Sequence, residues 1–288
     1  MANQNGRDSL LSVALLIVGM VSIQFSATMA KHLFETVHPA VITMMRTSFA
    51  AVFMLAVMRP WREKMAEKAW RRVALYGATL GVMNLLFYLA LRRIPLGIAV
   101  ALEFTGPLGV ALFGSRRALD IVWVLLATLG IYILLPAGGF SADLDLVGVL
   151  LALSAGCCWG LYIVFGKKAG SVASTRQAAA WGMVFAALIV LPFGLFHLDL
   201  NVLPLSLILR KGLLLALLSS AIPYSLEMIV LRKMDSKTFG TLMSIEPVIA
   251  ALMGLIFLRE YLQAFQILAM LAITTACLGA TITAPKTL

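Results

Sequence analysis

Four charged side chains lie inside long apolar stretches of this chain, at Arg46, Glu103, Glu227 and Glu246. An ionised group in hydrocarbon is costly, so such residues normally face a water-filled cavity or a partner. A guanidinium can hold a carboxylate, whereas a carboxylate can hold an ammonium group or a proton. We therefore expect these residues to bind a small charged molecule or to carry protons.

Each of these residues also has a purely structural interpretation. Arg46 and Glu103 can form a buried ion pair, and Glu227 and Glu246 can be core carboxylates whose hydrogen bonds are satisfied. Other polar or aromatic side chains in the same stretches extend the candidate site, although the aromatic ones can serve packing alone. They are Gln24, Asn84, Tyr88, Trp159, Tyr162, Tyr224 and Ser225.

Three prolines interrupt the apolar stretches. A proline within a helix leaves the carbonyl four residues earlier without its hydrogen bond. Pro107, Pro223 and Pro247 free the carbonyls of Glu103, Ser219 and Met243, respectively. Free carbonyls beside a carboxylate suit an ammonium group or a proton where the backbone lines a cavity. The segment from Glu103 to Pro107, which includes Gly106, is therefore our first candidate for such a seat.

The composition places these residues in a membrane protein. Of 288 residues, 61% are hydrophobic and 12% are charged, whereas a soluble domain carries roughly 25% charged residues. The net charge of +10 does not indicate nucleic-acid binding, because the basic residues lie in short loops between apolar runs, as orientation signals do. Membrane lipid is the expected environment.

Ten apolar segments are each close to the roughly 20 residues that a helix needs to cross a bilayer. We therefore predict an all-α membrane protein with ten transmembrane helices. The first segment is longer than the apolar region of a secretory signal, so we expect it to be retained. The segments are Leu10 to Met29, Ala40 to Val57, Val73 to Leu91, Leu96 to Phe113, Leu119 to Leu135, Leu146 to Phe165, Ala178 to Phe196, Gly212 to Val230, Thr238 to Leu258 and Leu262 to Ile282.

Lys and Arg are unevenly divided between alternate loops. With a cytoplasmic N-terminus, the inner segments hold 16 of these residues and the outer loops hold 6. Because cytoplasmic loops are enriched in basic residues, we expect both termini in the cytoplasm and the chain in a bacterial inner membrane. Arg46 and Glu103 then lie roughly 9 to 12 Å below the outer surface, at ~1.5 Å per residue. Glu227 and Glu246 are expected nearer the cytoplasm.

An internal repeat divides the chain. A shift of 140 residues superposes Pro107 on Pro247, the basic pair at 92 and 93 on the pair at 232 and 233, and Asp120 on Glu260. We therefore predict two five-helix halves, residues 1–140 and 141–288, and the odd number of crossings inverts the second half in the membrane. Asp120 and Glu260 lie beside helix starts, where N-terminal capping is their expected role.

Two stretches resemble the EamA-type transporters of the drug/metabolite transporter superfamily. They are PLGIAVALEFTGPLGVALFGSRR, from Pro95 to Arg117, and AIPYSLEMIVLRKMDSKTFGTLMSIEP, from Ala221 to Pro247. The resemblance runs through nearly the whole chain. It implies ten helices in two inverted EamA-type repeats and efflux of small amino acids such as L-threonine and L-homoserine. The first half departs from the family pattern, with Gln24-Phe25 in place of Trp-Gly and Gly106-Pro107 in place of Glu-Pro.

A zwitterionic amino acid matches the candidate residues. Its ammonium group needs an anion or carbonyls, its carboxylate needs a cation, and a hydroxyl group needs a polar partner. Glu103, Arg46 and either Asn84 or Gln24 can supply these. We expect efflux by alternating access, in which a proton neutralises Glu103 or Glu227 in exchange for substrate.

Three alternatives remain at this point. They are another cargo within the same superfamily (aromatic amino acids, drugs or other metabolites), a non-transporting membrane scaffold, and an intramembrane enzyme. No HExxH or GxSxG motif supports an enzyme, and no cofactor or metal is expected. We expect Cys157, Cys158 and Cys277 to be packing residues. The sequence leaves the oligomeric state open.

Overall fold

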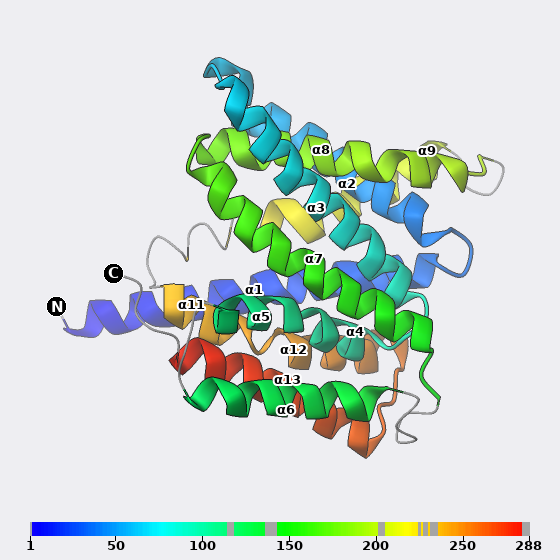
Figure 1. The fold of residues 1–288 in the computed structure, drawn as a ribbon. Coiled ribbons are helices and arrows are strands. Elements are labelled where there is room, and N and C mark those ends of the chain that lie inside the picture. Colours follow the sequence, from blue (N-terminus) through cyan, green and yellow to red (C-terminus); the bar gives the residue numbers. More distant parts are fainter. Residues whose placement is uncertain are drawn as a thin grey trace.

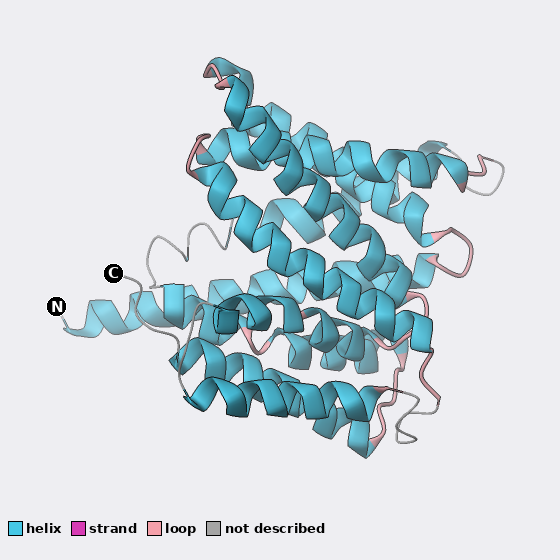
Figure 2. Ribbon diagram, viewed as in Figure 1, coloured by secondary structure: helices cyan, strands magenta, loops and turns pink. Residues whose placement is uncertain are grey.

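The computed structural model describes residues 2–113, 118–135, 143–200, 205–223, 226, 230 and 236–283. These residues form helices joined by loops, and none of them lies in a strand (Figure 2). The all-α fold is therefore confirmed for the described part of the chain.

The helices follow one another through both halves of the sequence (Figure 1). The first half holds α1 (Ala2–Leu33), α2 (Pro39–Met58), the 3₁₀ helix η1 (Pro60–Arg62), α3 (Glu67–Leu91), α4 (Leu96–Glu103), α5 (Thr105–Phe113) and α6 (Ala118–Leu134). The second half holds α7 (Leu146–Gly170), α8 (Thr175–Phe196), α9 (Leu205–Ala216), the π-helical segment η3 (Leu217–Ala221), α11 (Ser236–Met243), α12 (Glu246–Met253), the π-helical segment η4 (Gly254–Leu258) and α13 (Ala264–Thr283). Helix α1 begins and α13 ends at the same end of the bundle.

Seven helical segments are long and apolar enough to cross a membrane. They are Leu10–Leu33, Pro39–Met58, Glu67–Leu91, Leu146–Gly170, Thr175–Phe196, Phe239–Leu258 and Ala264–Thr283. Two shorter apolar helices, Leu96–Val110 and Leu119–Leu134, coincide with the fourth and fifth predicted spans. The predicted span from Gly212 to Val230 lies only partly within the described residues. The multi-pass membrane fold is thus confirmed, and the count of ten spans stays a prediction.

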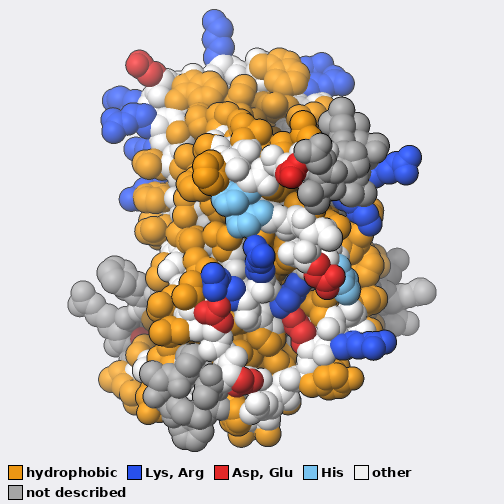
Figure 3. Space-filling view, turned by 90° about the vertical axis from the view of Figure 1, so that its right-hand side faces the viewer, with side chains coloured by type: hydrophobic (Ala, Val, Ile, Leu, Met, Phe, Trp, Pro, Cys, Tyr) orange, Lys and Arg blue, Asp and Glu red, His pale blue; other side chains and the backbone are white. Residues whose placement is uncertain are grey.

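The outer surface of the bundle is apolar along its length. Large hydrophobic side chains such as Phe196, Leu125 and Leu268 are 86%, 63% and 63% exposed, as expected where lipid surrounds the protein. Charged side chains gather at the ends. Figure 3 looks onto one end, where Lys and Arg side chains lie beside Asp and Glu side chains.

Two helices are interrupted just before a proline, and a third changes its geometry there. Helix α4 ends at Glu103 and α5 begins at Thr105, ahead of Pro107, whereas α11 ends at Met243 and α12 begins at Glu246, ahead of Pro247. Ahead of Pro223 the helix continues, but residues Leu217–Ala221 are π-helical. Proline lacks the N–H that would bond to the preceding turn, so regular helix geometry is lost there. The first two interruptions place one carboxylate at the last residue of a helix and another at the first residue of a helix.

The two halves of the chain pack against each other through pairs of helices. Helix α2 packs on α8, α4 on α12, α6 on α13, α3 on α7, and α1 on η3. The contact between α5 and α7 requires glycine, because a methyl group added at Gly106 would lie 1.8 Å from the carbonyl oxygen of Gly156. Small residues of this kind let helix backbones touch within a membrane.

Replacing Gly106 with alanine is expected to destabilise the protein, because α5 and α7 must then separate. We expect a loss of roughly 3 kcal/mol or more, measured as a lower midpoint of thermal unfolding in detergent. Gly109→Ala on the same helix is the matched control, since a methyl group there meets nothing within 4 Å. A Gly106→Ala midpoint equal to that of Gly109→Ala would contradict the packing described.

Candidate functional site

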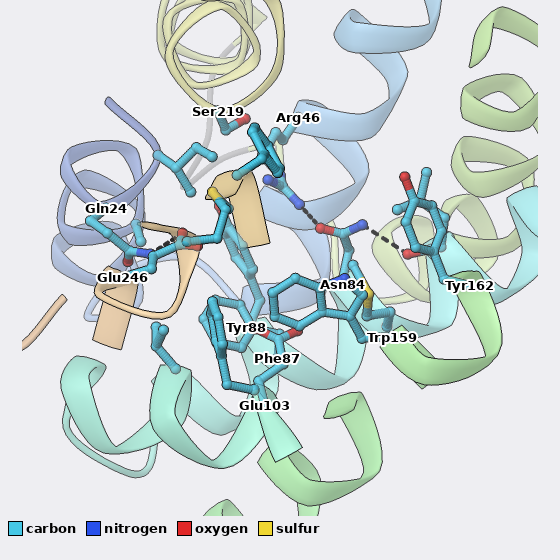
Figure 4. A pocket seen from close by; sticks show the side chains of 18 residues that line it. Gln24, Arg46, Asn84, Phe87, Tyr88, Glu103, Trp159, Tyr162, Ser219 and Glu246 are labelled. Carbon is cyan, nitrogen blue, oxygen red and sulfur yellow. Dashed lines mark hydrogen bonds between the residues drawn. The ribbon is translucent and has the colours of Figure 1, made fainter. Parts of the chain in front are cut away.

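A cavity of about 340 Å³ lies inside the bundle, and both halves of the chain line it (Figure 4). Its polar and aromatic lining residues come from α1, α2, α3, α4, α7, η3 and α12. They are Gln24, Arg46, Asn84, Phe87, Tyr88, Glu103, Phe104, Trp159, Tyr162, Ser219 and Glu246, together with Phe239 from α11. The structure thus brings eight of the predicted binding residues together, whereas Glu227 and Tyr224, like Ser225, lie outside the described residues. Their roles in binding remain predictions.

Arg46 is buried in the wall of this cavity and is oriented by neutral side chains. Its Nη2 donates a hydrogen bond to Asn84 Oδ1, and its guanidinium lies 4.8 Å from the centre of the Tyr88 ring. The Asn84 amide is fixed in turn, because its Nδ2 donates to the Leu80 carbonyl at 2.8 Å. Asn84 therefore positions the guanidinium, and its amide groups are occupied by protein partners.

The structural interpretation of Arg46 and Glu103 as an ion pair is wrong. Within the described part of the chain, the ion pairs with N to O distances up to 4.0 Å are Lys31–Glu260, Arg93–Asp145 and Arg176–Glu63. Because its hydrogen bond goes to a neutral amide, the positive charge of Arg46 stays available to an anion that enters the cavity.

The two carboxylates of the cavity come from different halves of the chain. Glu103 on α4 is 8% exposed and Glu246 on α12 is 5% exposed. Glu246 Oε1 accepts a hydrogen bond of 2.8 Å from Gln24 Nε2 on α1. This hydrogen bond links Glu246 directly to the other half of the chain.

Glu246, which the sequence predicts to lie nearer the cytoplasm than Glu103, lines the same cavity as Glu103. Glu103 and Glu246 each lie about eight residues from opposite surfaces, which is roughly 12 Å at 1.5 Å per residue. In a hydrocarbon core of ~30 Å, only about 6 Å then separates their depths. Long side chains close such a difference, so the two carboxylates face one space.

Apolar residues that the sequence did not single out complete the walls. Phe87, Phe239 and Met243 line the cavity, and a second, mostly apolar chamber of about 240 Å³ adjoins it. Phe104 and Trp159, which meet edge to face at 4.8 Å, line both spaces. In a chain this apolar, no sequence signal separates such wall residues from lipid-facing ones.

An ion pair joins the two halves of the chain at one end of the bundle. Lys31 Nζ at the end of α1 lies 2.5 Å from Glu260 Oε1 and donates to the Ile94 carbonyl at 2.6 Å. Glu260 Oε2 accepts the backbone N–H of Leu96 at 2.7 Å. Glu260 therefore caps the N-terminus of α4, a helix distant in sequence, and Asp120 lies in the first turn of α6.

Two further contacts at the same end involve titratable groups in loops. Arg93 Nη1 donates to Asp145 Oδ2 at 2.6 Å, and this hydrogen bond is the main reason that the pKa of Asp145 lies below its usual value. The His38 and His197 rings stack at 3.8 Å. Burial, helped by the charges of His197 and Arg92, lowers the pKa of His38. At neutral pH, Asp145 is therefore ionised and His38 is neutral.

An apolar helical bundle with a central cavity that holds buried charges from both halves is the architecture of a membrane transporter. Matches to known proteins define its family. The chain belongs to the EamA-like transporter family, which it matches over residues 10–135 and 146–282.

Several relatives are similar over most of their length. The chain is 47% identical over 283 residues to the threonine/homoserine exporter RhtA of Escherichia coli (strain K12), which covers 96% of this chain and 93% of that protein. It is 46% identical over 280 residues to the protein of the same name from Salmonella typhimurium (strain LT2), covering 95% and 92%. A solved crystal structure that is 20% identical has a similar fold, with a TM-score of 0.61 over 95% of this chain and 99% of that one.

Removing the charge of Glu260 is expected to weaken the closed end. Glu260→Gln leaves the mostly buried Lys31 ammonium without its carboxylate, which costs about 3 kcal/mol in comparable buried pairs. The thermal unfolding midpoint in detergent should fall accordingly. Arg176→Gln serves as the control, because the Arg176 side chain is 64% exposed and surface pairs contribute little. Equal midpoints for the two variants would show that the Lys31–Glu260 pair does not hold the halves together.

Proposed function

We propose that this protein exports L-threonine, L-homoserine and related small amino acids across the bacterial inner membrane by alternating access. One observation carries the proposal: a single buried cavity presents a guanidinium and two carboxylates, contributed by both halves of the chain. The names of the Escherichia coli and Salmonella typhimurium relatives support the choice of cargo.

The cavity offers a complementary group for each charge of an amino acid. The Arg46 guanidinium, held by a neutral amide, suits the substrate carboxylate, and Glu103 and Glu246 suit the ammonium group. The volume of about 340 Å³ is at the low end of the ~300 to 1,000 Å³ found for small-molecule sites. A small zwitterion therefore fits both the charge and the size of this space.

The pattern of helix packing supports two inverted halves, residues 1–140 and 141–288. In such a repeat, α2 and α8, α4 and α12, and α6 and α13 are counterparts, and each packs on the other. The contact of α3 with α7 then has its counterpart in the contact of η3 with α1. A two-fold axis in the membrane plane, as in many secondary transporters, produces this pattern.

The distribution of basic residues supports cytoplasmic N- and C-termini. In that orientation the end closed by Lys31 and Glu260 faces outward. The substrate then enters from the cytoplasm and leaves when this end opens. A proton that enters from outside and neutralises an intramembrane carboxylate would couple efflux to the proton gradient.

A second cargo class is favoured by one observation. The apolar chamber of about 240 Å³ adjoins the cavity through aromatic walls, and it suits an amino acid with a large apolar side chain. Aromatic amino acids are therefore the alternative substrates within the same family.

Transport in proteoliposomes with an imposed pH gradient tests the proposal. The wild-type protein should move radiolabelled threonine and homoserine in response to the gradient. Arg46→Ala removes the group proposed to bind the substrate carboxylate. Glu103→Gln removes one of the two carboxylates proposed to bind the substrate ammonium group. We expect each to lower gradient-driven transport tenfold or more, the usual effect of losing a hydrogen bond to a charged group.

Arg176→Gln, far from the cavity and exposed, is the control and should transport as the wild type does. Full gradient-driven transport by both Arg46→Ala and Glu103→Gln would rule out the assigned site. Preference for phenylalanine over threonine in the wild-type protein would support the alternative cargo.

A further inference from the structure

The two carboxylates of the cavity occupy opposite ends of their helices. Glu103 is the last residue of α4, and Glu246 is the first residue of α12. The N-terminal end of a helix carries a partial positive charge and stabilises an anion, whereas the C-terminal end carries a partial negative charge and disfavours one. The polarity of α12 therefore favours the ionised form of Glu246, whereas Glu103 lies where α4 ends and α5 begins, between ends of opposite polarity.

Hydrogen bonding adds to the same difference. Glu246 accepts a charge-stabilising hydrogen bond from Gln24 Nε2 at 2.8 Å. For Glu103, no side-chain hydrogen bond and no ion pair is formed with the described residues. Its own backbone carbonyl stands opposite Pro107, which has no N–H to donate. Protonating the Glu103 side chain thus breaks no hydrogen bond with the described residues, whereas protonating Glu246 weakens its hydrogen bond from Gln24.

The groups that face Glu103 come from several helices. They are Arg46 from α2, Tyr88 from α3, Cys158 from α7 and Glu246 from α12, with Cys277 of α13 bonded to the neighbouring Phe104 carbonyl. Arg46 is the one cation among these, and the cavity holds two carboxylates. One guanidinium balances one carboxylate, so the second carboxylate is neutral by proton uptake when no substrate is bound.

From this asymmetry we infer that the two carboxylates have different tasks in the exchange cycle: Glu103 carries the exchanged proton, and Glu246, positioned by Gln24, stays ionised and anchors the substrate ammonium. The inference rests on the proposed amino-acid transport and assigns its coupling residue. The substrate ammonium enters between the two carboxylates, and the Glu103 proton leaves to cytoplasmic water. After the substrate departs on the other side, Glu103 takes a proton from the water there.

Proton release on binding provides the test. Threonine binding to purified wild-type protein is measured by calorimetry in buffers of different ionisation enthalpy, which counts the protons released. We expect about one proton per threonine for the wild type and none for Glu103→Gln. Glu103→Asp, which keeps a titratable group, should release the proton again and guards against a folding defect in the amide variant.

Variants on the other side of the cavity separate the two tasks. Glu246→Gln should weaken threonine binding tenfold or more, and Gln24→Met should weaken it by a smaller factor, because the anion loses its positioning donor. Proton release should persist in Gln24→Met and in any binding that Glu246→Gln retains.

Three outcomes would overturn the assignment. Release that disappears in Glu246→Gln but persists in Glu103→Gln would reverse the two roles. Wild-type binding of threonine without proton release would refute the inference alone and leave the proposed cargo intact. A wild-type protein that binds no amino acid of the panel, with alanine, threonine, homoserine and phenylalanine included, would refute the proposed function as well.

Discussion

Burying ionised groups in hydrocarbon is the constraint on which the rest of this structure depends. Arg46, Glu103 and Glu246 are each less than 10% exposed, and isolated charges at this depth would not be tolerated in lipid. The fold accommodates them by enclosing a cavity between the halves and by giving Arg46 and Glu246 an amide partner each. The amides of Asn84 and Gln24 stabilise charge without neutralising it, so the cavity remains able to bind a charged molecule.

Broken helices are the second requirement of this arrangement. Pro107 and Pro247 occupy equivalent positions in the predicted repeat, and each follows a helix interruption by a few residues. Under the same 140-residue shift, Glu103 corresponds to Met243 and Gly106 corresponds to Glu246. The first half therefore has its carboxylate before the interruption, and the second half has its carboxylate after it. The predicted repeat therefore does not place its two carboxylates at equivalent positions.

Much of the fold and part of the site could be predicted from the sequence. Span length, charge distribution and charged residues in apolar segments are strong signals, because the bilayer penalises every exception. The pairing of side chains was harder to predict. The sequence suggested that Arg46 meets Glu103, but the structure pairs it with Asn84, because helix rotation decides which side chains meet and composition does not encode rotation.

Long-range contacts were also beyond the sequence pattern. N-terminal capping by Glu260 was expected, but its partners could not be named from the sequence. Glu260 contacts Leu96 of α4, more than 160 residues away, and Lys31, more than 220 residues away. Some wall residues carried no signal, since Phe239 and Met243 look like any other residues of an apolar span. Such contacts follow from how the halves dock, which only the three-dimensional arrangement shows.

The glycine contact between α5 and α7 restricts where the halves could rotate relative to each other in the proposed alternating access. At Gly106 and Gly156 the two backbones touch with no side chain between them, so the helices have no slack to slide or to compress at this point. Under the proposed alternating access, this contact would serve as the pivot beside the cavity. Helices that rotate about this contact would move little near the charged residues and most at the loops. A small rotation could then separate the loops at one end while leaving the binding groups nearly in place.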